Sequence, residues 1–150
     1  MMVTHRTFTK SLFATAILTM GLAGCSSMMP SNKVTLTGQL SAAQEVPPTV
    51  SSATGMAEAW LNKDTNVLTW KVTFSGLTGP ATAGHFHGPA AAGANAGVVV
   101  PFAGTTSPLE GQATLTPAQA ADLLAGKWYA NIHTAANKGG EIRGQMTPKM

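Results

Sequence analysis

Cysteine is almost absent from this sequence, since Cys25 is the only one among 150 residues. A single thiol cannot form an internal disulfide, so no disulfide framework supports the fold. Charged residues make up only 10% of the chain, and without Arg6 and Lys10 near its start seven basic residues face six acidic ones. No basic run remains, which excludes the surface that nucleic acids or anionic membranes require. We therefore expect no nucleic-acid partner.

Signatures of common catalytic sites are also absent. The sequence contains no Gly-x-Ser-x-Gly nucleophile elbow and no phosphate-binding loop. Glu58, Glu110 and Asp122 fall on different predicted elements, so nothing marks a paired general acid and base. The sequence predicts a protein that is not an enzyme.

The N-terminal segment reads as an export signal. Residues 1–10 carry basic side chains and no acid, and residues 11–24 form an apolar run that is short for a bilayer span of about 20 residues. A basic start, a short apolar stretch and small residues at its end are typical of a secretory signal. A short membrane anchor is the alternative.

The residues Leu22-Ala23-Gly24-Cys25 resemble the lipobox of bacterial lipoproteins. The resemblance implies cleavage before Cys25 and lipid attachment to its thiol, which explains the single cysteine better than an incidental free thiol does. Ser26 follows directly, and this resembles the pattern that sends Gram-negative lipoproteins to the outer membrane, facing the periplasm. We expect a signal peptide at 1–24, a lipidated tether at 25–32 and one folded domain at 33–147.

The folded part shows the period-two alternation of half-buried β-strands. The pattern is clearest where Leu68, Trp70, Val72 and Phe74 alternate with polar residues. Seven or eight short strands separated by turns predict an all-β, antiparallel, immunoglobulin-like sandwich. The strand candidates are 33–40, 53–61, 67–74, 81–87, 98–102, 111–115, 127–134 and 141–146.

One short helix is predicted near 117–125. Thr116 suits its N-cap and Pro117 its first position, while Gln119 completes a capping box. Gly126 ends it.

Three histidines in the predicted domain form the candidate site. His85 and His87 share one face of their strand because Phe86 takes the other, and His133 lies on the polar face of a later strand. A His-x-His pair places two rings about 6–7 Å apart at the backbone. With His133 they suit a copper or zinc ion. On the same polar faces, Asn131, Glu141 and Arg143 are candidates for supporting the ligands. The alternative is a structural network in which Arg143 pairs with Glu141 and the imidazoles brace loops.

Several motifs resemble the CHRD domain, named after chordin. They are Leu36-Thr37-Gly38 with Gln44-Glu45-Val46-Pro47-Pro48 and Ala53-Thr54-Gly55, then Gly84-His85-Phe86-His87-Gly88-Pro89-Ala90 with Gly97-Val98-Val99-Val100, and finally Tyr129-Ala130-Asn131-Ile132-His133-Thr134 with Gly139-Gly140-Glu141-Ile142-Arg143-Gly144-Gln145. The resemblance implies a β-rich extracytoplasmic domain. In chordin this domain accompanies modules that bind secreted growth factors, and in bacteria it occurs in small exported proteins.

The sandwich with a His-x-His strand is also similar to copper/zinc superoxide dismutase. Three function hypotheses follow. The first is a non-catalytic binding or structural module anchored in the cell envelope, with an envelope protein or polymer as partner. The second is binding of a transition-metal ion of the copper type by His85, His87 and His133. The third is a redox enzyme like superoxide dismutase at the same site, for which three histidines are few.

Overall fold

The computed structural model describes residues 1–2 and 32–149. The predicted cleavage site, the lipobox cysteine and most of the tether lie outside the described residues. Within the described part, no helix is long and apolar enough to span a membrane.

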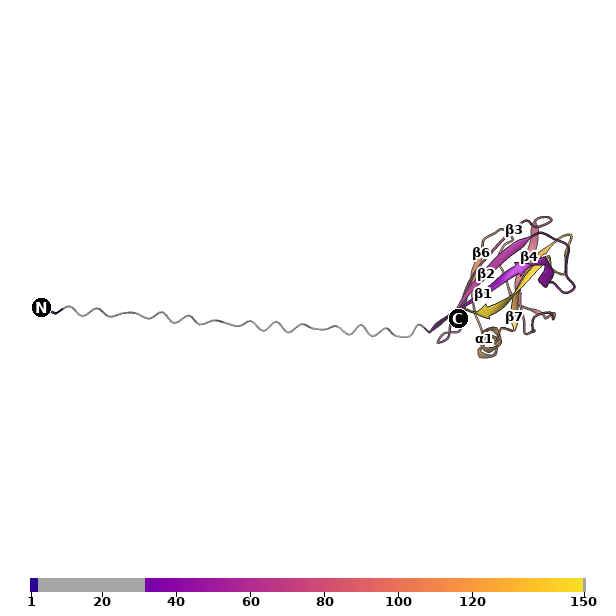
Figure 1. Cartoon of the computed structure of the whole chain (residues 1–150). Coiled ribbons are helices and arrows are strands. Elements are labelled where there is room, and N and C mark those ends of the chain that lie inside the picture. The colour runs from indigo at the N-terminus through magenta and orange to yellow at the C-terminus, as the bar shows by residue number, and fades with distance from the viewer. Residues whose placement is uncertain (3–31, 150) are drawn as a thin grey trace.

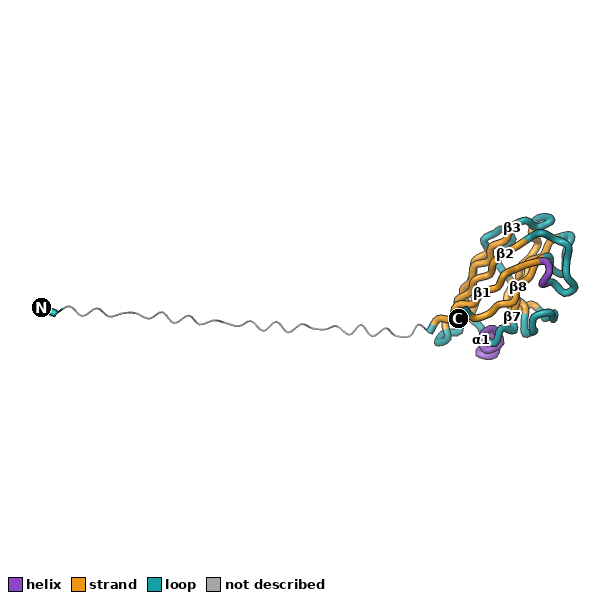
Figure 2. Tube along the Cα trace, viewed as in Figure 1, coloured by secondary structure: helices purple, strands orange, loops and turns teal. Residues whose placement is uncertain are grey.

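Eight antiparallel strands form one sheet in the order β5-β4-β7-β8-β1-β2-β3-β6. The strands are β1 (Lys33–Ser41), β2 (Thr54–Asn62), β3 (Val67–Ser75), β4 (Ala81–His87), β5 (Val98–Pro101), β6 (Leu109–Thr114), β7 (Trp128–Thr134) and β8 (Ile142–Pro148). A 3-10 turn, η1 (Ala42–Gln44), follows β1, and α1 (Pro117–Leu124) precedes β7. Figures 1 and 2 show the strands with the helix at one end, and the C-terminus beside the start of β1.

The sheet folds over on itself to make the sandwich that the alternation predicts. Trp70 on β3 meets Phe86 on β4 edge to face, with ring centroids 5.6 Å apart. These strands are not neighbours in the sheet, so their contact joins the two halves across the core. Of the four expected inward residues of β3, Leu68, Trp70 and Val72 are buried and Phe74 is partly buried against the core.

The local sequence signal for the helix is also confirmed. Thr116 Oγ1 accepts from the Gln119 backbone N–H, and the Gln119 side chain accepts from the Thr116 backbone N–H, so the predicted capping box is present. Strand β2 pairs in unbroken register with both of its neighbours through Gly55.

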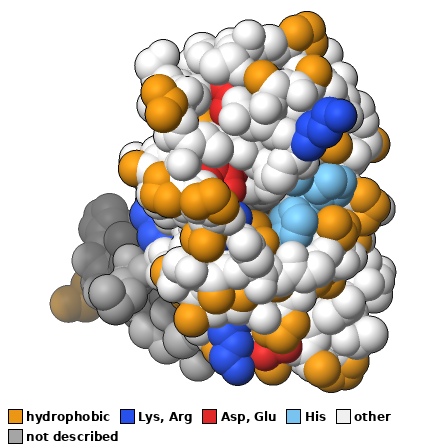
Figure 3. All heavy atoms as spheres, turned by 90° about the vertical axis from the view of Figure 1, so that its right-hand side faces the viewer, with side chains coloured by type: hydrophobic (Ala, Val, Ile, Leu, Met, Phe, Trp, Pro, Cys, Tyr) orange, Lys and Arg blue, Asp and Glu red, His pale blue; other side chains and the backbone are white. Residues whose placement is uncertain are grey.

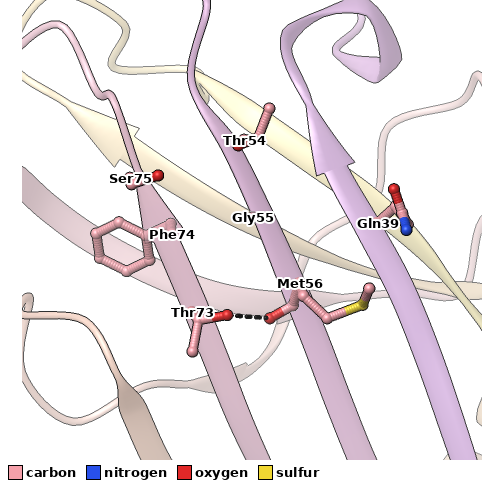
Figure 4. A pocket seen from close by; sticks show the side chains of 7 residues that line it. All are labelled: Gln39, Thr54, Gly55, Met56, Thr73, Phe74 and Ser75. Carbon is pink, nitrogen blue, oxygen red and sulfur yellow. Dashed lines mark hydrogen bonds between the residues drawn. The ribbon is translucent and has the colours of Figure 1, made fainter.

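A hollow lies on the outer face of β1, β2 and β3 and contains no histidine. It measures about 620 Å³ and is lined by Gln39, Thr54, Gly55, Met56, Thr73, Phe74 and Ser75. Figure 4 shows the lining residues on three neighbouring strands, with Thr73 donating a hydrogen bond to the Met56 carbonyl. The histidine site is therefore separate from this hollow.

Candidate metal centre

Strand pairing between β4 and β7 brings the three histidines together. His85 lies opposite Asn131 and His87 opposite Tyr129, while His133 pairs with Ala83. All three imidazoles project from the face of these strands that points away from Phe86 and Ile132. The arrangement depends on β4 and β7 being neighbours, which the sequence alone did not establish.

The imidazoles are close enough to share one ion. His85 Nδ1 lies 3.1 Å from His133 Nε2, and one nitrogen from each ring can be chosen so that all three lie within 4.8 Å of one another. An ion with bonds of about 2.0–2.1 Å separates tetrahedral nitrogen ligands by about 3.4 Å. The 3.1 Å pair is close to this spacing, and ring movements of about 1.4 Å would bring the third nitrogen to it. Figure 3 shows histidine side chains reaching the surface together on one face.

Two of the rings have their protons placed by backbone carbonyls. His87 Nδ1 lies 3.0 Å from the Ala96 carbonyl, and His133 Nδ1 lies 2.9 Å from the Lys138 carbonyl. A carbonyl only accepts, so each Nδ1 carries the proton. Each Nε2 of these two neutral rings is then left with a lone pair, and the one on His133 accepts a hydrogen bond from His85 Nδ1. Metal-binding histidines commonly have their other nitrogen held in this way.

The buried Nε2 of His87 has no hydrogen-bond partner. His87 is only 9% exposed, so water does not readily compensate for the missing bond. Unpaired buried acceptors are costly, and an ion bound between the imidazoles would satisfy this one. Asn131 Oδ1 is a second buried acceptor without a partner on the same strand face.

The electrostatic surroundings favour neutral imidazoles. Burial lowers the pKa of His85, and the nearby His133 and His87 lower it further. Burial also lowers the pKa of His87, against the opposing effect of its bond to the Ala96 carbonyl. Both rings are therefore more readily available as ligands near neutral pH than ordinary histidines.

Arg143 and Asn131 meet beside the histidines around a residue that sequence reasoning missed, Glu45. Arg143 Nε donates to Glu45 Oε2 over 2.8 Å, and Asn131 Nδ2 donates to Glu45 Oε1 over 2.6 Å. All three side chains are at most 5% exposed. Burial raises the pKa of Glu45, and Arg143 opposes that rise. The available signal for Glu45 was its place in the motif Gln44-Glu45-Val46-Pro47-Pro48.

Glu141 belongs to a different cluster from the one expected. Its carboxylate accepts hydrogen bonds from Ser51, Thr78, Thr134 and Asn137, and the described residues show no hydrogen bond between it and a histidine. Burial alone would raise the pKa of Glu141, but the bonds from Thr134, Ser51 and Thr78 outweigh burial and lower it to about 2. The expected Arg143–Glu141 pair is wrong, because Arg143 pairs with Glu45.

The polar face of β7 is covered, which alternation alone did not reveal. Tyr129 and Asn131 are 3% and 1% exposed because the segments 42–49 and 88–97 lie over them. Tyr129 stacks on His87, with ring centroids 4.9 Å apart and planes 1° from parallel. Its position two residues before Asn131 and four before His133 on one strand face was the available signal for its role.

Comparison with protein families matches residues 36–146 to the CHRD domain. No curated protein and no solved structure matches the chain. The matched region contains all three histidines together with Glu45, Tyr129 and Arg143. The motifs around these residues and the match over most of the chain agree, and the chain belongs to the CHRD domain family.

Proposed function

We propose that this protein is a lipid-anchored component of the cell envelope whose CHRD domain is a non-catalytic module that binds a copper-type transition-metal ion. The ligands are His85, His87 and His133. Membership of the CHRD family supports the general role of a binding or structural module. The geometry of the histidines favours a metal ion as the bound species over the other hypotheses.

The observation that carries the proposal is the arrangement of lone pairs. Two backbone carbonyls place the protons of His87 and His133 on Nδ1, so both Nε2 atoms are left with a lone pair, and the one on His133 accepts from His85 Nδ1. The Nε2 atom of His87 is buried and unpaired. Neutral nitrogen ligands suit copper and zinc, and copper(II) binds more tightly than zinc at a given site of this kind.

Titration of the purified full chain in detergent with copper(II), followed by calorimetry and electron paramagnetic resonance, tests the proposal. We expect one saturable site per chain with nitrogen hyperfine structure. His85→Ala or His133→Ala should weaken binding by more than about 100-fold, beyond the 10- to 100-fold cost of losing a group that only supports a ligand.

Gln112→Ala is the matched control, because Gln112 is an exposed polar residue on β6, away from the histidines. Its affinity should equal that of the wild type. A wild-type protein without a saturable copper signal, or a signal unchanged by both histidine substitutions, would contradict metal binding. Zinc titration in parallel tests the preference for copper.

The envelope location rests on the lipobox-like residues 22–25. Cys25 carries the lipid in this proposal, and the domain faces the periplasm from the outer membrane. Several acyl chains are needed for stable anchoring. Labelling with radioactive palmitate should mark the wild type and leave Cys25→Ser unlabelled. Recovery of the wild-type protein in a soluble fraction would contradict anchoring.

The non-catalytic assignment has its own test. Copper-loaded wild-type protein should remove superoxide no faster than an equal amount of copper bound to an unrelated protein. A clear excess that disappears in His85→Ala would favour the redox-enzyme alternative.

A further inference from the structure

Residues 94–97 form the segment that bonds the Nδ1 atom of His87. The Ala96 carbonyl accepts from His87 Nδ1 over 3.0 Å, and the Ala96 backbone N–H donates to Tyr129 Oη over 3.1 Å. One residue of this segment therefore joins His87 to Tyr129. A displacement of the segment would remove the acceptor that keeps the His87 proton on Nδ1.

Arg143 fixes the same segment from the other side. Its Nη1 donates to the Ala94 carbonyl over 3.2 Å, and its Nη2 donates to Asn95 Oδ1 over 2.7 Å. Its Nε is held by Glu45. The planar guanidinium donates hydrogen bonds to three acceptors at once. The ammonium of a lysine would not reproduce this geometry.

Arg143 and Tyr129 also contact each other. The guanidinium carbon lies 4.3 Å from the centre of the Tyr129 ring, and that ring stacks on His87. A continuous set of contacts therefore runs from Glu45 through Arg143 and Tyr129 to His87. All four side chains are at most 9% exposed.

We propose that Arg143 and Tyr129 are positioning residues that hold the Ala96 carbonyl against His87 Nδ1 and so keep Nε2 free as a ligand atom. This inference rests on the proposed metal function. The Ala96 carbonyl, and not a side chain, places the proton of His87 on Nδ1. The availability of Nε2 as a ligand atom therefore depends on residues 94–97 keeping their position. Arg143 and Tyr129 order that loop before any ion arrives, which reduces the entropy lost on binding.

A purely structural role for the loop explains the hydrogen bonding of the two His87 ring nitrogens less well. A histidine that only braces a loop would be expected to pair both ring nitrogens, because it is buried. Here one nitrogen is firmly bonded and the other is buried without a partner. Arg143 and Tyr129 hold the segment that bonds His87 Nδ1, whereas the unpaired nitrogen of His87 is Nε2.

Two conservative substitutions test the inference. Tyr129→Phe keeps the stacked ring and removes the hydroxyl that bonds Ala96, and Arg143→Lys keeps the charge and removes the fork. In the metal-free full chain, nitrogen-15 NMR should show the wild-type His87 with its proton on Nδ1, with the signal assigned from the His87→Gln spectrum. Both variants should show a mixture of tautomers and bind copper about 10- to 100-fold more weakly.

Gln145→Leu is the matched control. Gln145 Nε2 donates to the Ala90 carbonyl at the other end of the same loop and to the Gly126 carbonyl, and in the described part of the chain its side chain shows no hydrogen bond to residues 94–97. It should keep the wild-type tautomer and an affinity within about twofold.

The outcomes separate this inference from the proposed function. Wild-type tautomers in both Tyr129→Phe and Arg143→Lys, or an equal loss of the tautomer in Gln145→Leu, would overturn the positioning role. Should Arg143→Lys fail to fold, Tyr129→Phe decides. A wild-type protein that binds no copper overturns the metal function instead, and the NMR result still decides the positioning role.

Discussion

Glu45 Oε2 accepts a hydrogen bond of 2.8 Å from Arg143 Nε although 98 residues separate them in the chain. The pair joins the turn after β1 to the start of β8, and both side chains are at most 5% exposed. A buried ion pair adds little net stability compared with apolar residues, but removing one partner leaves an uncompensated charge. The stability of the fold beside the histidines therefore depends on both Glu45 and Arg143.

Glu45→Ala should lower the free energy of unfolding by about 3–5 kcal/mol, because Arg143 would remain charged and buried. Denaturant unfolding followed by tryptophan fluorescence measures the change. Glu110→Ala is the control, since Glu110 pairs with Lys71 at 3.0 Å and their side chains are 60% and 44% exposed. That substitution should cost at most about 1 kcal/mol. Equal losses in the two variants would contradict the buried pair.

Acid should destabilise the fold through Glu141. Its folded-state pKa of about 2 lies below the ordinary value of 4.5, so its contribution to stability is present above pH 4.5 and is lost as the pH falls toward 2. The difference corresponds to about 3 kcal/mol.

Denaturant unfolding of the wild type and Glu141→Gln at several pH values between 2 and 7 isolates this contribution. The variant should be less stable at pH 7, and the two curves should converge as the pH approaches 2. A constant gap between them would show that the carboxylate is not responsible.

A side chain at Gly84 should disturb the core between the two halves of the sheet. A Cβ there would lie 2.8 Å from Phe102 Cδ2 and 3.0 Å from Ile132 Cδ1. Gly84→Ala should therefore cost about 1–3 kcal/mol of unfolding free energy. Gly79→Ala is the control, because a Cβ at Gly79 meets no atom within 4 Å. It should change stability by less than about 0.5 kcal/mol.

Copper affinity should depend on pH in a way set by the lowered pKa values of His85 and His87. Protons compete with the ion only where the imidazoles become charged. Because burial lowers both pKa values below 6.5, protonation of these two rings should weaken copper binding only below pH 6.5. Calorimetry between pH 5 and 8 measures this dependence. A steep loss of affinity between pH 8 and 7 would contradict neutral rings.

Local patterns in the sequence were enough to predict most of the fold. The alternation from Leu68 to Phe74 predicted β3, and Thr116, Pro117 and Gln119 predicted the start of α1. The shared face of His85 and His87 followed from Phe86 lying between them. These predictions succeeded because strand periodicity and helix capping depend on residues a few positions apart.

The site itself needed the order of the strands and the course of the loops. That His133 would lie 3.1 Å from His85 depends on β7 being the neighbour of β4. The carbonyls of Ala96 and Lys138, which place the ring protons, are invisible in any side-chain pattern.

The sequence by itself determined which side chains share a strand face, because a strand alternates its side chains with a period of two. Only the tertiary structure decided which charges meet on that face. Alternation gave Glu141 and Arg143 the same face, yet the loop after β1 brings Glu45 to Arg143, while Glu141 is held by hydroxyl and amide groups from three other segments. A buried charge pairs with whatever long-range contacts bring within hydrogen-bond distance, and sequence periodicity carries no record of those contacts.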